Sequence, residues 1–133
     1  MKRWFADTFF FIALLNERDD AHEPAIEIMQ DFHGRIVTTR WVLAELANAM
    51  AAPLTRKRCA DYLRFLETDG DVEIVGEEGE LYERGLRLYE ERLDKEWSLT
   101  DCISFVVMQR KRLKEALTGD HHFEQGGFVA LLR

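Results

Sequence analysis

The stretch RWFADTFFFIALL, residues 3–15, decides the fold. Its first five residues are typical of a short strand buried on both faces of a parallel sheet, and a helix is expected to follow over residues 8–20. Asp7 is the only charged residue between Trp4 and Leu15. An ionised carboxylate in apolar surroundings is costly unless it is paired, hydrogen-bonded or bound to a metal. Asp7 must therefore have a partner or lie at an edge.

The composition indicates one ordered domain spanning residues 1–133. The chain has 133 residues, 47% of them apolar, which is enough for a hydrophobic core. Two prolines, eight glycines and the absence of repeats or biased tracts favour order throughout. Cys59 and Cys102 are isolated in the sequence, so we expect reduced thiols in the core rather than a disulfide.

The N-terminal residues share one feature with a secretory signal, because Lys2 and Arg3 precede an apolar run. Asp7 interrupts that run, however, and no small-residue cleavage site precedes the charged NERDD segment. The run is also shorter than the roughly 20 residues of a membrane-spanning helix. We therefore expect a cytoplasmic protein with no membrane partner.

Charge is unevenly distributed along the chain. The net charge of −7 argues against a nucleic-acid partner, because affinity for phosphate rests on Lys and Arg. Between Glu67 and Glu96, however, twelve acids and four bases give −8, so the remainder carries +1. Basic residues cluster at 56–58 and 110–114, either as binding surfaces or as solvated helix faces.

Strand-like and helix-like segments alternate along the sequence. This alternation predicts an α/β fold whose mostly parallel sheet is covered by helices on both faces. Ligands of such sheets bind at the carboxyl ends of the strands, where Asp7 and Asp120 are expected. Further strands are predicted at 35–39, 71–76, 116–120 and 128–132, and further helices at 20–34, 39–52, 54–70, 77–93 and 98–115.

Four carboxylates stand out from the solvated acids: Asp7, Glu45, Asp101 and Asp120. Each has a structural interpretation of its own. Asp7 is typical of a helix N-cap and Asp120 of a turn. Glu45 suits the rim of a helix. Ser98 and Asp101 have the S-x-x-D spacing of a capping box. Two of the four follow strands and two lie near helix starts, which places all four on one rim of the sheet.

Carboxylates gathered on one rim repel one another and take up protons unless a cation holds them. Mg²⁺ or Mn²⁺, which prefer oxygen ligands, would solve that problem. Such an ion activates water and stabilises charge on a phosphodiester, so the pattern predicts a nuclease.

No sequence spacing supports zinc. We expect His122 to be structural and His22 and His33 to lie at the surface. No phosphate-binding loop, dinucleotide fingerprint or serine-esterase elbow occurs.

Four motifs carry a family resemblance over nearly the whole chain. In order and spacing they resemble the PIN-domain ribonucleases, particularly VapC-like toxins of type II toxin–antitoxin systems. The most specific feature is SLTDC, followed about twenty residues later by GDHHFEQGGF. The motifs are FADTFFFIALL, VTTRWVLAELANAM, SLTDCISFVVM and LTGDHHFEQGGFVALL.

The resemblance implies a three-layer α/β/α fold with about five short strands and an acidic catalytic quartet. Asp7 and Asp101 would bind Mg²⁺ directly, with Mn²⁺ as a possible substitute, and Thr8 and Ser98 would contact the site through their hydroxyls. Glu45 and Asp120, the remaining quartet members, would bind a second ion or orient water.

The activity implied by the resemblance is endonucleolytic cleavage of RNA that leaves a 5′-phosphate and a 3′-hydroxyl. Similar proteins are homodimers inhibited by a small antitoxin. Two alternatives stay open, a solitary RNA-processing nuclease and a non-catalytic module that binds RNA or protein. Phosphoryl transfer to Asp7 is a third, although the second aspartate it calls for is replaced by Phe9.

Overall fold

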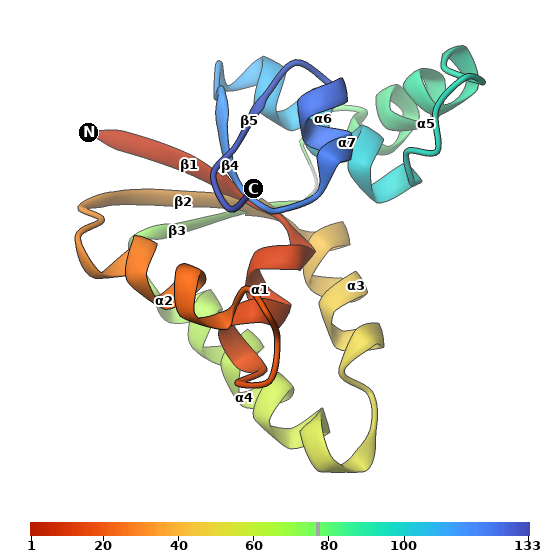
Figure 1. The fold of residues 1–133 in the computed structure, drawn as a ribbon. Helices are drawn as coiled ribbons and strands as arrows, with labels where there is room; N and C mark the ends of the chain where they lie inside the picture. The colour runs from red at the N-terminus through yellow and green to blue at the C-terminus, as the bar shows by residue number, and fades with distance from the viewer. Residues whose placement is uncertain (77) are drawn as a thin grey trace.

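The computed structural model describes residues 1–76 and 78–133 and contains a parallel sheet (Figure 1). Within those residues the sheet has five strands in the order β3-β2-β1-β4-β5, and every pairing is parallel. This confirms the predicted α/β/α class and its mostly parallel sheet. The strands are β1 (Lys2–Ala6), β2 (Gly34–Thr39), β3 (Val72–Val75), β4 (Glu115–Leu117) and β5 (Val129–Ala130).

Helices connect the strands and cover both faces of the sheet. Figure 1 shows α1, α2 and α4 below the sheet, and α6 and α7 above it with α5 beside them. The helices are α1 (Thr8–Leu15), α2 (His22–Gln30), α3 (Arg40–Ala49), α4 (Pro53–Thr68), α5 (Leu81–Glu91), α6 (Leu99–Arg110) and α7 (His121–Gln125).

The strand order reverses direction at β1. The chain steps from β1 to β2 to β3, and then crosses back past β1 to β4. Since parallel crossovers are right-handed, steps in opposite directions place their helices on opposite faces of the sheet. The switch point of the sheet therefore lies at the carboxyl ends of β1 and β4, which is where ligands of such sheets bind.

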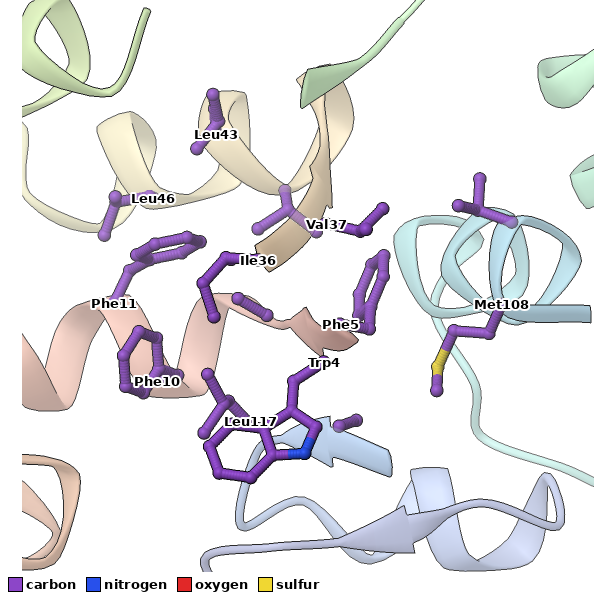
Figure 2. Packing of buried hydrophobic residues seen from close by; sticks show 14 of the residues in the cluster. Trp4, Phe5, Phe10, Phe11, Ile36, Val37, Leu43, Leu46, Met108 and Leu117 are labelled. Carbon is purple, nitrogen blue, oxygen red and sulfur yellow. The ribbon is translucent and has the colours of Figure 1, made fainter. Parts of the chain in front are cut away.

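The hydrophobic core fills both faces of β1. Trp4 stacks on Phe32 with ring centroids 4.3 Å apart, whereas the next residue, Phe5, faces Phe123 of α7 at 6.3 Å. Figure 2 shows Phe5 turned toward the helix that carries Met108. Because neighbouring strand residues point to opposite faces, the apolar run of β1 buries side chains in two layers at once.

Several predicted boundaries are shifted. The helix predicted over residues 98–115 ends at Arg110, because Arg112 takes a left-handed conformation (φ 58°) and turns the chain into β4. The helix predicted from Glu77 begins at Leu81, and Glu77 itself lies outside the described residues. The sequence pattern predicts no element between residues 120 and 128, where the structure has the short helix α7.

Two smaller predictions can be compared with the structure. Cys59 and Cys102 are buried free thiols, as expected. Of the two basic clusters, residues 56–58 are exposed on α4, while Lys111 pairs with Glu73 at 2.7 Å. Among the described helices, none combines the length and apolar character that a membrane crossing requires.

Candidate metal centre

Asp7 lies where β1 ends and α1 begins, and it is only 4% exposed. It occupies the N-cap position of α1, but its side chain makes no capping hydrogen bond, and the helix start is served by its backbone carbonyl, which accepts the Phe10 N–H. The carboxylate instead accepts a hydrogen bond of 2.9 Å from the Thr118 hydroxyl. Capping by the side chain therefore explains neither the choice of aspartate at position 7 nor the burial of its carboxylate.

The surroundings of Asp7 disfavour its charged form. Burial, followed by the negative charge of Asp101 and a smaller contribution from Glu45, raises the pKa of Asp7 to about 7, although hydrogen bonds from Thr118 and the Thr8 backbone oppose the shift. A buried carboxylate beside like charges behaves in this way when no cation compensates it. Asp7 thus has the electrostatic character expected of a cation ligand.

Glu45 lies half-buried on α3 and is tied to α1 by a side-chain hydrogen bond. The hydroxyl of Thr8, the first residue of α1, donates to Oε1 of Glu45. The bond confirms that Thr8 contacts one of the singled-out carboxylates through its hydroxyl. It also holds Glu45 next to the residue that follows Asp7 in the chain.

Asp101 and Ser98 form the predicted capping box at the start of α6. The Ser98 hydroxyl accepts the Asp101 N–H at 3.0 Å, and the Asp101 carboxylate accepts the Ser98 N–H at 3.1 Å. Oδ2 of Asp101 also lies 3.1 Å from Nδ1 of His122. Burial and the negative charge of Asp120 raise the pKa of Asp101, while the hydrogen bond from the Ser98 backbone and the contact with His122 lower it. The net shift is upward, so the capping box does not fully compensate the negative charge of Asp101.

Asp120 caps α7, the short helix that follows β4. Its Oδ1 accepts the His122 N–H at 2.9 Å, and its own backbone N–H donates to the Thr118 hydroxyl oxygen at 3.1 Å. The turn interpretation of Asp120 is therefore replaced by a helix cap. His122 lies 3.4 Å from Asp120 through Nδ1, which gives it contacts to two of the four acids.

Thr118 was missed in the sequence and is central to the arrangement. It is fully buried at the end of β4, donates to Asp7 and accepts from the Asp120 backbone. The available signal was a threonine two residues before an acid, inside the segment predicted as a strand over residues 116–120. Of the other histidines, His33 is exposed as predicted, but His22 is half-buried with Nδ1 2.7 Å from the Ala13 carbonyl, so its surface prediction was wrong.

The structure brings the four acids into one electrostatic group. The charges of Asp101 and Glu45 act on Asp7, and the charge of Asp120 acts on Asp101. All four come from segments that meet at the carboxyl ends of β1 and β4. Their donors are carboxylate oxygens, the ligands that Mg²⁺ and Mn²⁺ prefer. Among the described residues no lysine or arginine forms an ion pair with these four acids, while His121 and His122 lie close to Asp120, and His122 also to Asp101.

Comparison with known proteins defines the family. The PIN-domain family model matches residues 5–129, so the chain belongs to the PIN-domain family. Within it, the chain is similar to the VapC toxins. The curated relative "23S rRNA-specific endonuclease VapC20" of Mycobacterium tuberculosis is 27% identical over 129 residues, which cover 94% of this chain and 95% of the relative. The predicted family resemblance is confirmed.

Solved structures agree with this assignment. The crystal structure of Mycobacterium tuberculosis VapC20, described as a sarcin–ricin loop cleaving toxin, has a TM-score of 0.87 and 25% identity, with 96% of this chain and 97% of that one covered. A toxin–antitoxin complex from Klebsiella pneumoniae shares the fold, with a TM-score of 0.66, 18% identity and coverage of 96% and 97%. VapBC2 of Rickettsia felis bound to promoter DNA also shares the fold, with a TM-score of 0.67, 15% identity and coverage of 97% of both chains.

Proposed function

We propose that this chain is a Mg²⁺-dependent endoribonuclease and the toxin of a type II toxin–antitoxin pair, with residues 1–133 acting as one PIN domain. The observation that carries the proposal is the gathering of four carboxylates around buried Asp7, where burial and the charges of Asp101 and Glu45 raise the pKa of Asp7 to about 7. Family membership and the printed activity of the VapC20 relative support the same reaction.

The donor set fits a hard divalent cation. Asp7 and Asp101 are the proposed direct ligands, because they are the most buried of the four acids and both have raised pKa values. Glu45 and Asp120 would orient water or help to hold a second ion. Bound there, Mg²⁺ would polarise the phosphodiester and lower the pKa of water, and Mn²⁺ is expected to substitute.

The chain's own residues fix the geometry of this reaction. Thr118 holds Asp7, Thr8 holds Glu45, and Ser98 holds Asp101, each through a hydroxyl hydrogen bond to the side chain or backbone. Orientation by such bonds lowers the reorganisation needed during the reaction.

The substrate is proposed to be RNA, and attack of water on the phosphodiester would leave a 5′-phosphate and a 3′-hydroxyl. The exposed basic residues at 56–58 on α4 supply charge for binding the phosphate backbone. The VapC20 relative directs attention to 23S rRNA as the first substrate to test.

The proposed partners are a small antitoxin and a second copy of the chain, in the cytoplasm. Toxin–antitoxin complexes among the structural neighbours support the antitoxin. A solitary RNA-processing nuclease would keep the chemistry and lack the antitoxin. Membership of the PIN-domain family argues against phosphoryl transfer to Asp7.

The test is cleavage of 23S rRNA and of a sarcin–ricin loop oligonucleotide by the purified chain, freed of any inhibitor. We expect cleavage with Mg²⁺ or Mn²⁺, its loss with EDTA, and its loss in Asp7→Asn. Asp20→Asn makes the same change at an exposed position and should cleave normally. RNA that is bound but left intact under all these conditions would support a non-catalytic binding module and overturn the proposal.

A further inference from the structure

Asp120 is followed by two histidines whose side chains gather around its carboxylate. Nδ1 of His121 lies 3.6 Å and Nδ1 of His122 lies 3.4 Å from Oδ1 of Asp120. The two imidazole rings are 4.5 Å apart. Consecutive residues of a helix normally point about 100° apart, so the convergence of both rings on one carboxylate is a specific local arrangement.

The arrangement has the dimensions of a transition-metal site. Each of the three residues offers one possible ligand atom, and these atoms all lie within 4.8 Å of one another. With metal–ligand distances of about 2.0–2.2 Å, a tetrahedral zinc site has ligand-to-ligand separations of about 3.4 Å. The Asp120-to-histidine distances of 3.6 and 3.4 Å already approach that value.

We propose that Asp120, His121 and His122 form a binding site for a borderline transition metal, of which Zn²⁺ is the best match, beside the acidic centre. Two imidazoles and one carboxylate favour Zn²⁺ over Mg²⁺, which prefers oxygen ligands. Three protein ligands leave a fourth position for water.

The surroundings support binding at this place. Asp120 and His122 are half-buried and held by α7, because the Asp120 carboxylate accepts the His122 N–H at 2.9 Å. His121 is exposed and gives an ion direct access from solvent. Oδ2 of Asp101 lies 3.1 Å from Nδ1 of His122, the ring nitrogen that also faces Asp120, and adds negative charge beside the site. Asp120 would belong to both centres, so Zn²⁺ would withdraw it from the acidic quartet.

The experiment is a Zn²⁺ titration of the untagged chain without RNA, in competition with a chromophoric chelator. We expect one high-affinity ion per chain and a loss of affinity of about tenfold or more in His121→Gln, which changes an exposed side chain and leaves the fold intact. His33→Gln, at another exposed histidine, should bind Zn²⁺ like the parent. Co²⁺ should give visible absorption bands of a tetrahedral site in the parent and lose them in His121→Gln.

Asp7→Asn separates this site from the proposed Mg²⁺ centre. It removes a quartet acid and keeps the trio, so Zn²⁺ affinity should persist even if the chain proves to cleave no RNA. Two results would overturn the inference. One is equal Zn²⁺ affinity in the parent and in His121→Gln, and the other is no Zn²⁺ binding by the parent at a Zn²⁺ concentration about a hundred times a micromolar Kd.

Discussion

The hydroxyl of Thr118 donates a hydrogen bond of 2.9 Å to Oδ2 of Asp7, joining residues 111 positions apart at the ends of β4 and β1. The same hydroxyl oxygen accepts the backbone N–H of Asp120 at 3.1 Å. One buried threonine therefore fixes two members of the acidic quartet relative to each other. It also lowers the pKa of Asp7 against the opposing effects of burial and of Asp101.

Thr118→Val keeps the shape of the side chain and removes this bond. The pKa of Asp7 should then rise further, so the affinity for Mn²⁺ at pH 7 should fall about tenfold and the pH midpoint of binding should shift upward. Calorimetric Mn²⁺ titrations over pH 6–9 measure both, and Thr118→Ser should restore them. Thr38→Val is the matched control, because its buried hydroxyl donates to the Ala6 carbonyl rather than to a carboxylate. Equal shifts in both valine variants would contradict a positioning role for Thr118.

Asp7→Asn should stabilise the metal-free protein at pH 8. Because the folded-state pKa is raised, the folded chain retains a proton that the unfolded chain releases, and stability falls as the pH rises from about 4 to about 7. At pH 8 the substitution should therefore raise the free energy of unfolding by as much as about 4 kcal/mol. The gain should vanish below about pH 4, where Asp7 is protonated in both states.

Urea unfolding in EDTA at pH 4 and pH 8 measures this difference. Asp20→Asn, at an exposed position, should change stability little at either pH. A loss of stability in Asp7→Asn at pH 8 would mean that the carboxylate has a compensating partner within the chain.

Binding of Mg²⁺ or Mn²⁺ should release close to one proton at pH 6 and almost none above pH 8. The reason is that Asp7, with a pKa of about 7, must lose its proton before it can act as a ligand. Calorimetry in two buffers of different ionisation enthalpy counts the protons. At a concentration one hundred times Kd the ion should stabilise the fold by about 2.7 kcal/mol, and chelation should remove that gain. Binding without proton release at pH 6 would exclude Asp7 as a ligand.

Ser98→Ala should cost about 1 kcal/mol of stability, because it removes the hydroxyl that accepts the Asp101 N–H in the capping box of α6. Thermal and urea unfolding measure the loss. Ser98→Thr keeps the hydroxyl and should recover most of the stability. A cost in the alanine variant as small as that of an exposed substitution would show that the cap contributes little.

The four acids could be singled out from the sequence because each stands beside a recognisable local signal. Asp7 ends an apolar strand, Asp101 stands at the spacing of a capping box, and both signals are short-range. The parallel sheet was predictable from alternating strands and helices, since crossover rules leave few ways to connect them. These local signals explain why the fold class and the common rim of the acids could be predicted.

Contacts between distant segments could not be predicted in this way. The bond from Thr118 to Asp7 depends on β4 lying beside β1, and nothing in the residues around Thr118 states that pairing. The five-residue helix α7 is too short for a helical period to appear, so the gathering of His121 and His122 around Asp120 was hidden as well. His22 was assigned to the surface because its contact to the Ala13 carbonyl depends on how α2 packs against α1.

The most direct test of the proposed acidic metal centre is an anomalous difference map from crystals grown with Mn²⁺. A peak bounded by the carboxylates of Asp7 and Asp101, absent in crystals of Asp7→Asn, is the expected result. A map without a peak at these carboxylates, from crystals that hold Mn²⁺ elsewhere on the chain, would contradict the proposal that the quartet is a divalent-ion centre.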